Sequence, residues 1–163
     1  DVVLDVDGGA TPPVSMALAV TATAKTATFD TPSLGSPATA ARLQVVWANA
    51  PSGFSAAAVS AAFSVEPAYV TVTSPIGGET WLIGSKRNVT WVHNLGSLEK
   101  VTIELSQDDG ASYPVVVLGS TPSDGSQAVN VQSAWATTLG RIRVAWLESP
   151  AAGDASDAAF VIR

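Results

Sequence analysis

The chain has 163 residues, enough for one large domain or two small ones, and its lack of cysteine excludes disulfides, zinc thiolate sites and thiol nucleophiles. Charged residues are 13% of the total, and the net charge of −6 without any basic patch argues against nucleic acid as a partner. The longest apolar stretches are too short to cross a bilayer, so no membrane insertion is expected. A surface this poor in charge suggests that neighbours cover part of it in an assembly.

Apolar and polar residues alternate along the chain and no amphipathic helical stretch is present, which predicts an all-β fold. In the first part, strands are expected near residues 1–6, 14–21, 26–30, 41–48 and 58–65. In the second part, they are expected near 69–74, 79–82, 86–92, 100–106, 113–118, 127–132, 140–147 and 158–162. Turn-forming residues separate these segments, and the rhythm of the second part is typical of a two-sheet sandwich.

The chain contains an internal repeat. Residues 41–53, A-R-L-Q-V-V-W-A-N-A-P-S-G, match residues 140–153, G-R-I-R-V-A-W-L-E-S-P-A-A-G. The segment L-D-V-D-G-G-A-T from Leu4 matches L-S-Q-D-D-G-A-S from Leu105 in the same alignment. The front section of the second copy, residues 68–99, has no counterpart in the first. We therefore expect an incomplete unit over residues 1–66 and a complete unit over residues 67–163.

The second unit contains S-P-I-G-G-E-T-W at residues 74–81 and N-V-T-W at residues 88–91. With these motifs it resembles the immunoglobulin-like or fibronectin-III-like domain of bacterial secreted proteins. It is also similar to the N-terminal domain of the Ser/Thr-rich, GPI-anchored cell-wall family of fungi. The resemblance covers residues 69–162 and implies an extracellular or cell-surface spacer, adhesion or cell-wall module. The fold expected is two tandem immunoglobulin-like β-sandwich units, the first lacking its N-terminal strands.

No catalytic constellation is found. His93 is the only histidine, and exposure at the end of a predicted strand explains it better than a role as a general base. No G-x-S-x-G motif, phosphate loop or H-E-x-x-H motif is present. The sequon Asn88-Val89-Thr90 lies within a predicted strand and is expected to be incidental. We expect neither enzymatic activity nor a cofactor.

Two acidic runs are weak candidates for calcium binding, because alternate carboxylates beside a glycine can surround a hard cation. They contain Asp5 and Asp7 in the first unit and Asp108 and Asp109 in the second. The bidentate Glu that would close a calcium loop is missing from both runs. Because the two runs occupy equivalent hairpin positions, Asp-Gly turn chemistry is the favoured explanation.

Five tryptophans raise the question of sugar stacking. Trp47 and Trp146 share an alternation face with the core valines, and Trp81 and Trp91 belong to the motifs of the resemblance, so all four are predicted to lie in the core. Trp135 is the one candidate for an exposed platform. A cell-wall polysaccharide is therefore a possible partner.

The first unit is expected to be an open sandwich. Its inward-facing residues would lie partly exposed and its sheet edges unpaired, so it could accept a strand from a neighbour. The inward residues are Val2, Leu4, Val6, Leu43, Val45, Trp47 and Phe63. On the outer face, Val3 and Val46 stand where the second unit has Glu104 and Ala145, which makes them candidates for an assembly interface. In the second unit, Glu104 is expected to pair with Arg143 across neighbouring strands.

The sequence thus favours a non-enzymatic structural subunit of an extracellular filament, sheath or surface layer, a homo-oligomer or polymer built by exchange of β-strands between subunits. The alternative is a spacer, adhesion or carbohydrate-binding module of a larger secreted protein. The two differ in whether the missing front strands come from a neighbouring subunit or from sequence upstream of residue 1.

Overall fold

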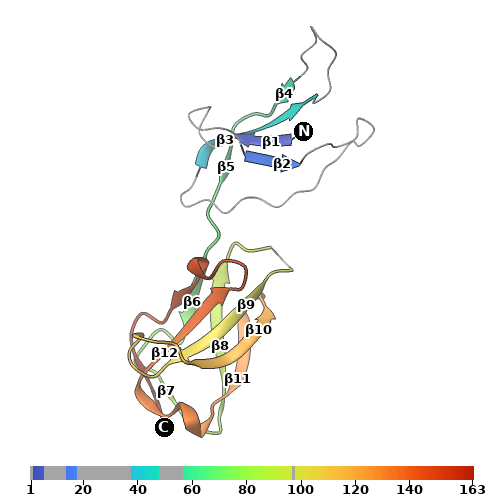
Figure 1. The fold of residues 1–163 in the computed structure, drawn as a ribbon. Helices are drawn as coiled ribbons and strands as arrows, with labels where there is room; N and C mark the ends of the chain where they lie inside the picture. The colour runs from blue at the N-terminus through green and yellow to red at the C-terminus, as the bar shows by residue number, and fades with distance from the viewer. Residues whose placement is uncertain (1, 6–13, 18–37, 48–56, 97) are drawn as a thin grey trace. The chain divides into compact units, whose positions relative to one another are not determined.

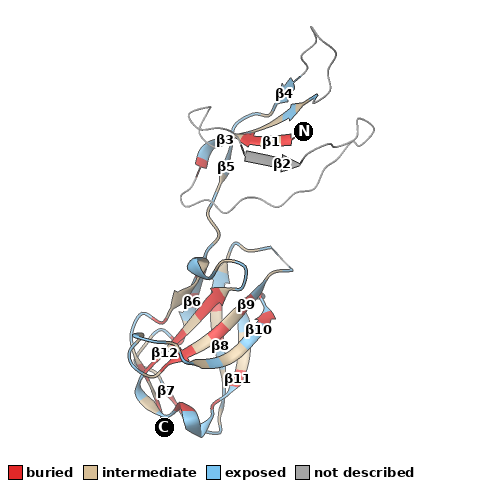
Figure 2. Ribbon diagram, in the orientation of Figure 1, coloured by how far each residue is buried: buried red, intermediate tan, exposed pale blue. Residues whose placement is uncertain are grey.

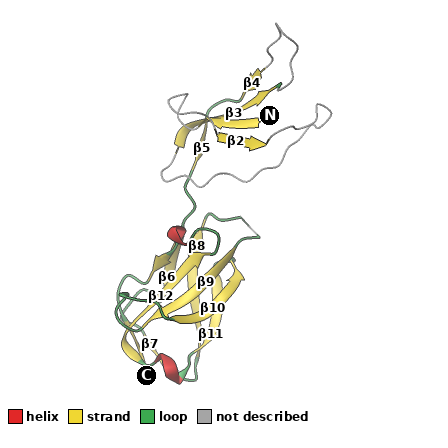
Figure 3. Ribbon diagram, viewed as in Figure 1, coloured by secondary structure: helices red, strands yellow, loops and turns green. Residues whose placement is uncertain are grey.

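The structure is a computed structural model that describes residues 2–5, 14–17, 38–47, 57–96 and 98–163. The strand expected near residues 26–30, together with Val6 and Asp7, lies outside these ranges. The described residues form β-sheets and two short 3₁₀ helices, so the fold is all-β, as the alternation predicts (Figure 3). The chain divides into two compact units, Asp1–Pro67 (unit 1) and Ala68–Arg163 (unit 2) (Figure 1).

Within the described part of the chain, no helix has the length and apolar character needed to cross a membrane.

Unit 2 is built from two sheets. The larger has the strand order β10-β9-β12-β14-β7, with β13 also paired to β12, and the smaller has the order β11-β8-β6. Neighbouring strands are antiparallel except for β14 and β7, which are parallel. The strands are β6 (Val70–Ser74), β7 (Thr80–Trp81), β8 (Lys86–His93), β9 (Lys100–Ser106), β10 (Val115–Pro122), β11 (Ser126–Asn130), β12 (Thr137–Trp146), β13 (Asp154–Ala155) and β14 (Phe160–Ile162). The 3₁₀ helices are η1 (Ser133–Trp135) and η2 (Pro150–Ala152).

The core of unit 2 lies between its two sheets. Alternate residues of β9 and β12, and of β6 and β8 in the second sheet, are buried (Figure 2) and belong to one cluster. Ile103, Leu105 and Val144 are almost completely buried in this cluster. The apolar face of each alternating strand is therefore buried against the other sheet.

The motif S-P-I-G-G-E-T-W forms the turn between β6 and β7. Gly77 and Gly78 have φ angles of +133° and +80°, which L side chains rarely adopt. The carboxylate of Glu79 accepts hydrogen bonds from the amides of Ile76 (2.8 Å) and Gly77 (2.7 Å) and so closes the turn. The turn delivers Trp81 into the core, with its ring centroid 4.8 Å from that of Phe160. The glycines, the glutamate and the tryptophan of this motif therefore each have a structural role in the turn or in the core.

Unit 1 contains one described sheet with the order β2-β1-β3-β4, and β5 also pairs with β3. Its strands are β1 (Val2–Asp5), β2 (Val14–Ala17), β3 (Ala38–Val46), β4 (Ala57–Val59) and β5 (Phe63–Val65). The single strand expected over residues 58–65 is therefore two short ones. The strand is interrupted at Ser60. The Ser60 amide donates to the carbonyl of Leu43 (2.8 Å), and the Ser60 hydroxyl accepts from the Leu43 amide (3.0 Å).

Strand pairing in unit 1 follows the pairing in unit 2 under the alignment of the sequence repeat. β2-β1-β3 corresponds to β10-β9-β12, and β4 and β5 pair with β3 as β13 and β14 pair with β12. The paired residues are Val2 with Val45 and Leu4 with Leu43 in unit 1, and Ile103 with Val144 and Leu105 with Ile142 in unit 2. The register shifts between Ala38 and Ala41 in one unit and between Thr137 and Gly140 in the other. The five described strands thus share order and register with five strands of unit 2.

The serine that separates the last two strands is also repeated. In unit 2, the Ser156 amide donates to the carbonyl of Ile142 (2.8 Å) and the Ser156 hydroxyl accepts from the Ile142 amide (3.0 Å). Arg42 and Arg141 each donate from Nη1 to the carbonyl of the serine in their own unit, at 3.1 and 3.0 Å. Equivalent residues therefore make equivalent bonds in the two units.

Replacing Gly77 with alanine should destabilise unit 2 strongly. A Cβ at this position would lie 2.5 Å from the Cβ of Ala158 and 2.9 Å from its backbone, in addition to the unfavourable φ. Gly78→Ala is the matched control, because nothing lies within 4 Å of its Cβ and only the strain of about 1–2 kcal/mol remains. Urea unfolding should show a clearly larger loss for Gly77→Ala. Equal losses for the two variants would contradict this account of the turn.

Candidate functional site

The inner face of the unit 1 sheet is partly exposed where the equivalent face of unit 2 is buried. Val45 is 54% exposed, whereas its counterpart Val144 is fully buried. Phe63 is 36% exposed, whereas its counterpart Phe160 is also fully buried. We call Val45, Trp47 and Phe63 the open face. Large apolar side chains that share one face of a sheet are a feature of surfaces that bind another protein segment.

Trp47 was predicted to lie in the core, and this is wrong: its side chain is 54% exposed. Its counterpart Trp146 is half-buried, and its Nε1 donates to a carboxylate oxygen of Glu99 at 2.7 Å. Trp47 lies on the same face as Val45, and no described strand covers this end of the sheet. The alternation predicted the correct face for Trp47 but not its burial.

The residues that cover the equivalent face in unit 2 come from the second sheet. Val70 and Val72 of β6, Val89 and Trp91 of β8 and Val129 of β11 belong to the same buried cluster as the inner face of β9 and β12. The buried cluster described in unit 1 consists of Leu4, Ala38 and Ala41, with Leu43 and Val65 packed against it. Val2 and Leu4 on β1, expected to lie partly exposed, are buried, although Val2 pairs with the exposed Val45. The exposed part of the described inner face is therefore limited to Val45 and Trp47 beside β4 and to Phe63 on β5.

The outer faces of the two units differ at one cross-strand pair. In unit 2, Arg143 Nε donates to a carboxylate oxygen of Glu104 at 2.8 Å, which confirms the predicted cross-strand pair. The Arg143 guanidinium also lies 4.6 Å from the ring centroid of Tyr113. In unit 1 the equivalent cross-strand pair is Val3 with Gln44, which carries no charge. Val3 and Val46, the candidates for an assembly interface, lie half-buried on the neighbouring strands β1 and β3.

Asp108 belongs to a closed hydrogen-bond network in the turn after β9. One carboxylate oxygen accepts from the Ser106 hydroxyl (2.6 Å) and the Ser112 amide (2.9 Å), and the other accepts from the Ser112 hydroxyl (2.6 Å). These bonds, that of Ser106 first, lower the pKa of Asp108 from 3.8 to about 2. The carboxylate therefore stabilises the turn.

Asp109, the neighbouring calcium candidate, has a φ of +61° and accepts a hydrogen bond from Arg141 Nε at 2.6 Å. Asp5 lies at the end of β1, and Asp7 is outside the described residues. Among the residues that the structure describes, no three His, Cys, Asp or Glu side chains form a group that could hold a metal ion. The described geometry of the Asp108 and Asp109 turn agrees with the favoured turn chemistry.

Trp135 was predicted to be an exposed platform, and this is wrong, because it is only 5% exposed and belongs to the core of unit 2. Residues Ser133–Trp135 form the short helix η1, and the side-chain amide of Gln107 donates to the carbonyls of Ala134 (3.1 Å) and Ala136 (3.2 Å) on either side. These bonds hold the backbone on both sides of Trp135, and its indole packs in the core. The apolar residue at the aligned position in the first unit, Leu34, is the sequence signal that indicates a core position.

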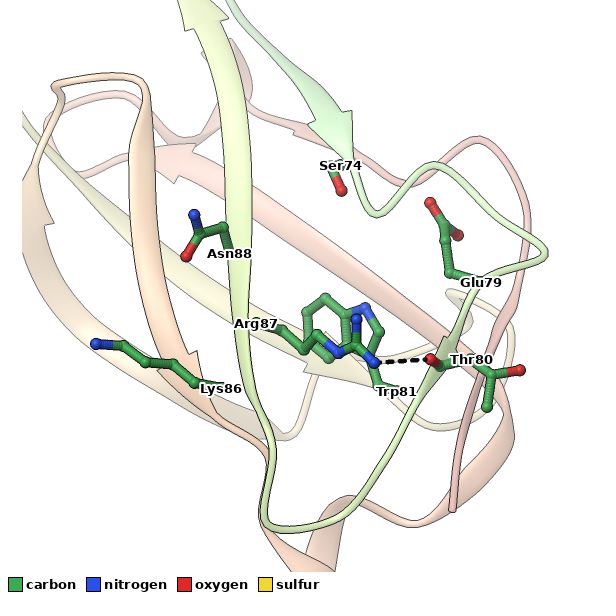
Figure 4. Close-up of a pocket in the computed structure, with 7 residues that line it drawn as sticks. All are labelled: Ser74, Glu79, Thr80, Trp81, Lys86, Arg87 and Asn88. Atoms are coloured by element: carbon green, nitrogen blue, oxygen red, sulfur yellow. Dashed lines mark hydrogen bonds between the residues drawn. The ribbon is translucent and has the colours of Figure 1, made fainter.

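A hollow of about 410 Å³ lies beside the turn of the S-P-I-G-G-E-T-W motif, between β7 and β8 (Figure 4). The carboxylate of Glu79 on its wall is already bonded within the turn. Arg87 Nη2 approaches the Thr80 carbonyl at 3.5 Å, and Arg87 Nε is buried without a hydrogen-bond partner. Because this nitrogen is closed to solvent, a ligand in the hollow would not reach it. We assign the hollow to the architecture of the turn.

His93 ends β8 as predicted, although it is half-buried rather than exposed. Its Nδ1 accepts a hydrogen bond from the amide of Leu95 at 3.1 Å. The ring nitrogen that would act as a base on this side is therefore occupied by the backbone.

Comparisons of the chain with protein-family models, with curated proteins and with solved structures gave no match. The chain's own repeat is therefore the comparison on which a function can be argued.

The stability of unit 2 should depend on the charge of Asp108 in acid. Its pKa is about 2 in the folded state and lies below its usual value, so its contribution is fully present above about pH 4 and is lost as the pH falls to about 2. Urea unfolding between pH 2 and 5 should show a weaker acid dependence in Asp108→Asn than in the original protein. Ser112→Ala should raise the NMR titration midpoint of Asp108, since it removes a donor. An unchanged acid dependence in Asp108→Asn would contradict this role.

Proposed function

We propose that the protein is a non-enzymatic structural subunit of an extracellular assembly, a filament, sheath or surface layer, in which a neighbouring subunit completes the open sandwich of unit 1. Both units are taken to be copies of one immunoglobulin-like sandwich. In this proposal, the exchange of β-strands between subunits gives a homopolymer, with main-chain hydrogen bonds supplying affinity and side-chain pockets supplying register.

The observation that carries the proposal is the contrast in exposure between equivalent residues. Val45 and Phe63 occupy the same positions in strand order and register as Val144 and Phe160, yet only the unit 2 residues are fully buried. Full burial of a side chain of this size is worth about 1.5–3 kcal/mol. Covering the open face would therefore provide a substantial driving force for association.

The outer face supports the same proposal. The cross-strand positions that hold Glu104 and Arg143 in unit 2 hold Val3 and Gln44 in unit 1. Exposed charges such as those of Glu104 and Arg143 keep a sheet surface hydrated and discourage contact with other sheets. This charged pair is absent at the equivalent position in unit 1, although the next pair along the same face, Asp5 with Arg42, carries charge.

The second candidate is a spacer or adhesion module of a larger secreted protein, and the missing strands would then precede residue 1 in the same chain. Binding of a polysaccharide through Trp135 is no longer favoured, because sugar stacking needs an exposed ring face and this indole is buried. The open face is common to both candidates. They differ in whether a neighbouring molecule is needed to cover it.

Replacing Val45 with lysine should reduce assembly, because it places a charge at the centre of the open face. The matched control is Val92→Lys on β8 of unit 2, where the side chain is exposed to a similar extent, 52% against 54%. Sedimentation velocity and electron microscopy at high protein concentration should show assemblies for the original chain and for Val92→Lys, and a smaller assembled fraction for Val45→Lys. A chain that stays a monodisperse monomer at every concentration, or two variants that assemble equally, would overturn the proposal.

A further inference from the structure

We propose that Asn88 is an N-glycosylation site whose glycan covers the outer face of the smaller sheet of unit 2. From the sequence alone, the sequon Asn88-Val89-Thr90 was expected to be incidental, but its place in the fold favours its use. The site rests on the extracellular placement made under the proposed function, because N-glycans are added to exported chains. It does not depend on how unit 1 is completed.

The side chain of Asn88 points away from the core. Asn88 lies on β8, the central strand of the order β11-β8-β6, and is exposed, whereas its neighbour Val89 is fully buried. Figure 4 shows the side chains of Lys86 and Asn88 on one side of β8 and that of Arg87 on the other. A glycan on Asn88 would therefore extend into solvent, whereas one attached a residue earlier or later in the strand would meet the core.

The neighbouring strands leave room for a sugar beside Asn88. The residue paired with it on β11 is Ala128, whose side chain is only a methyl group. On the other side, β6 ends at Ser74, which pairs with Thr90, so β6 has no residue opposite Asn88. No hydrogen bond within the described part of the chain holds the side-chain amide of Asn88. The nitrogen that would carry the sugar is thus free and accessible.

The outer face of this sheet is almost without charge. The charged residues on its strands are Lys86 and Arg87, and Arg87 shares the inward parity of Val89. Besides Lys86, Asn88 and Ala128, the outer face is formed by uncharged residues: Thr71, Thr73, Thr90, Val92, Ser126 and Asn130. Such a face favours packing against another sheet, and a bulky, solubilising glycan at its centre would prevent that contact.

We place the transfer before folding. In the folded unit, the hydroxyl of Thr90, which the sequon requires, shares a hydrogen bond of 2.8 Å with the hydroxyl of Thr73 on β6. Before β6 and β8 pair, both Asn88 and this hydroxyl are open to a transferase. The co-substrate is an oligosaccharide linked to a lipid diphosphate. The Asn88 nitrogen bonds to the anomeric carbon as the bond from that carbon to the diphosphate oxygen breaks. The lipid diphosphate leaves, and the amide nitrogen loses a proton.

The site is tested by peptide mass spectrometry of the full chain purified from the organism that produces it. Fragmentation should locate a sugar on Asn88. Asn130 is the matched control in the same molecule, because it is exposed on the same face but is followed at the second position by Gln132, and it should be unmodified.

Variants made in the same host separate the sequon from the fold. Thr90→Ala should abolish the modification, and Thr90→Ser should keep it, because the hydroxyl is retained. Thr73→Ala should also keep it, because this change removes the hydrogen bond to Thr90 but leaves the sequon intact. An unmodified Asn88 in the native chain, or a sugar that survives in Thr90→Ala, would overturn the inference.

The covering role of the glycan is tested with Asn88→Gln. In sedimentation velocity at equal concentration, this variant should show a larger associated fraction than the glycosylated chain, and adding Val45→Lys should not remove the excess, because the new contact lies on unit 2. Asn130→Gln is the control and should leave association unchanged. Equal association of Asn88→Gln and Asn130→Gln would overturn the covering role. Assemblies of a native chain unmodified at Asn88 would leave the proposed function standing without the glycan, whereas a glycosylated chain that never assembles would uphold the site and overturn the assembly.

Discussion

A β-sheet with one apolar face is stable in water only when a second layer covers that face. Unit 2 meets this requirement internally, because β6, β8 and β11 place their valines and tryptophan against β9 and β12. The described part of unit 1 has the same inner face, but Val45, Trp47 and Phe63 on it are exposed. An apolar face that its own unit leaves exposed favours a covering segment from elsewhere.

The two units share a pair of serine hydrogen bonds beside the longest strand of the sheet. In each, a serine hydroxyl accepts from the amide of the long strand while the serine amide donates to the same residue. The short strands before and after this serine, β4 and β5 or β13 and β14, therefore both pair with the same long strand. In unit 2 this brings Phe160 to the edge that β7 completes. In unit 1 it brings Phe63 to an edge beside which no strand is paired within the described part of the chain.

Much of the fold was predictable from local patterns. The alternation gave the all-β class, the strands of unit 2 and the faces of Ile103 and Val144, because period-2 patterning follows directly from strand geometry. The cross-strand pair of Glu104 with Arg143 was predictable for the same reason. Burial was less predictable, because it depends on what covers a face. Trp47 is exposed since its face lacks a described cover, and Trp135 is buried because it packs in the core of unit 2, on a helix that Gln107 bonds on both sides. Neither the missing cover of Trp47 nor the packing of Trp135 can be predicted from the residues next to it in the sequence.

Amide hydrogen exchange of the full chain, measured over a range of protein concentrations, tests the central claim most directly. The amide of Ser64 is the counterpart of that of Val161, which donates to the Glu79 carbonyl in unit 2. If a neighbouring subunit completes unit 1, protection of Ser64 should rise with concentration, whereas protection of Val161 should be high throughout. Fast exchange at Ser64 at every concentration, including conditions in which assemblies are visible by electron microscopy, would contradict the account.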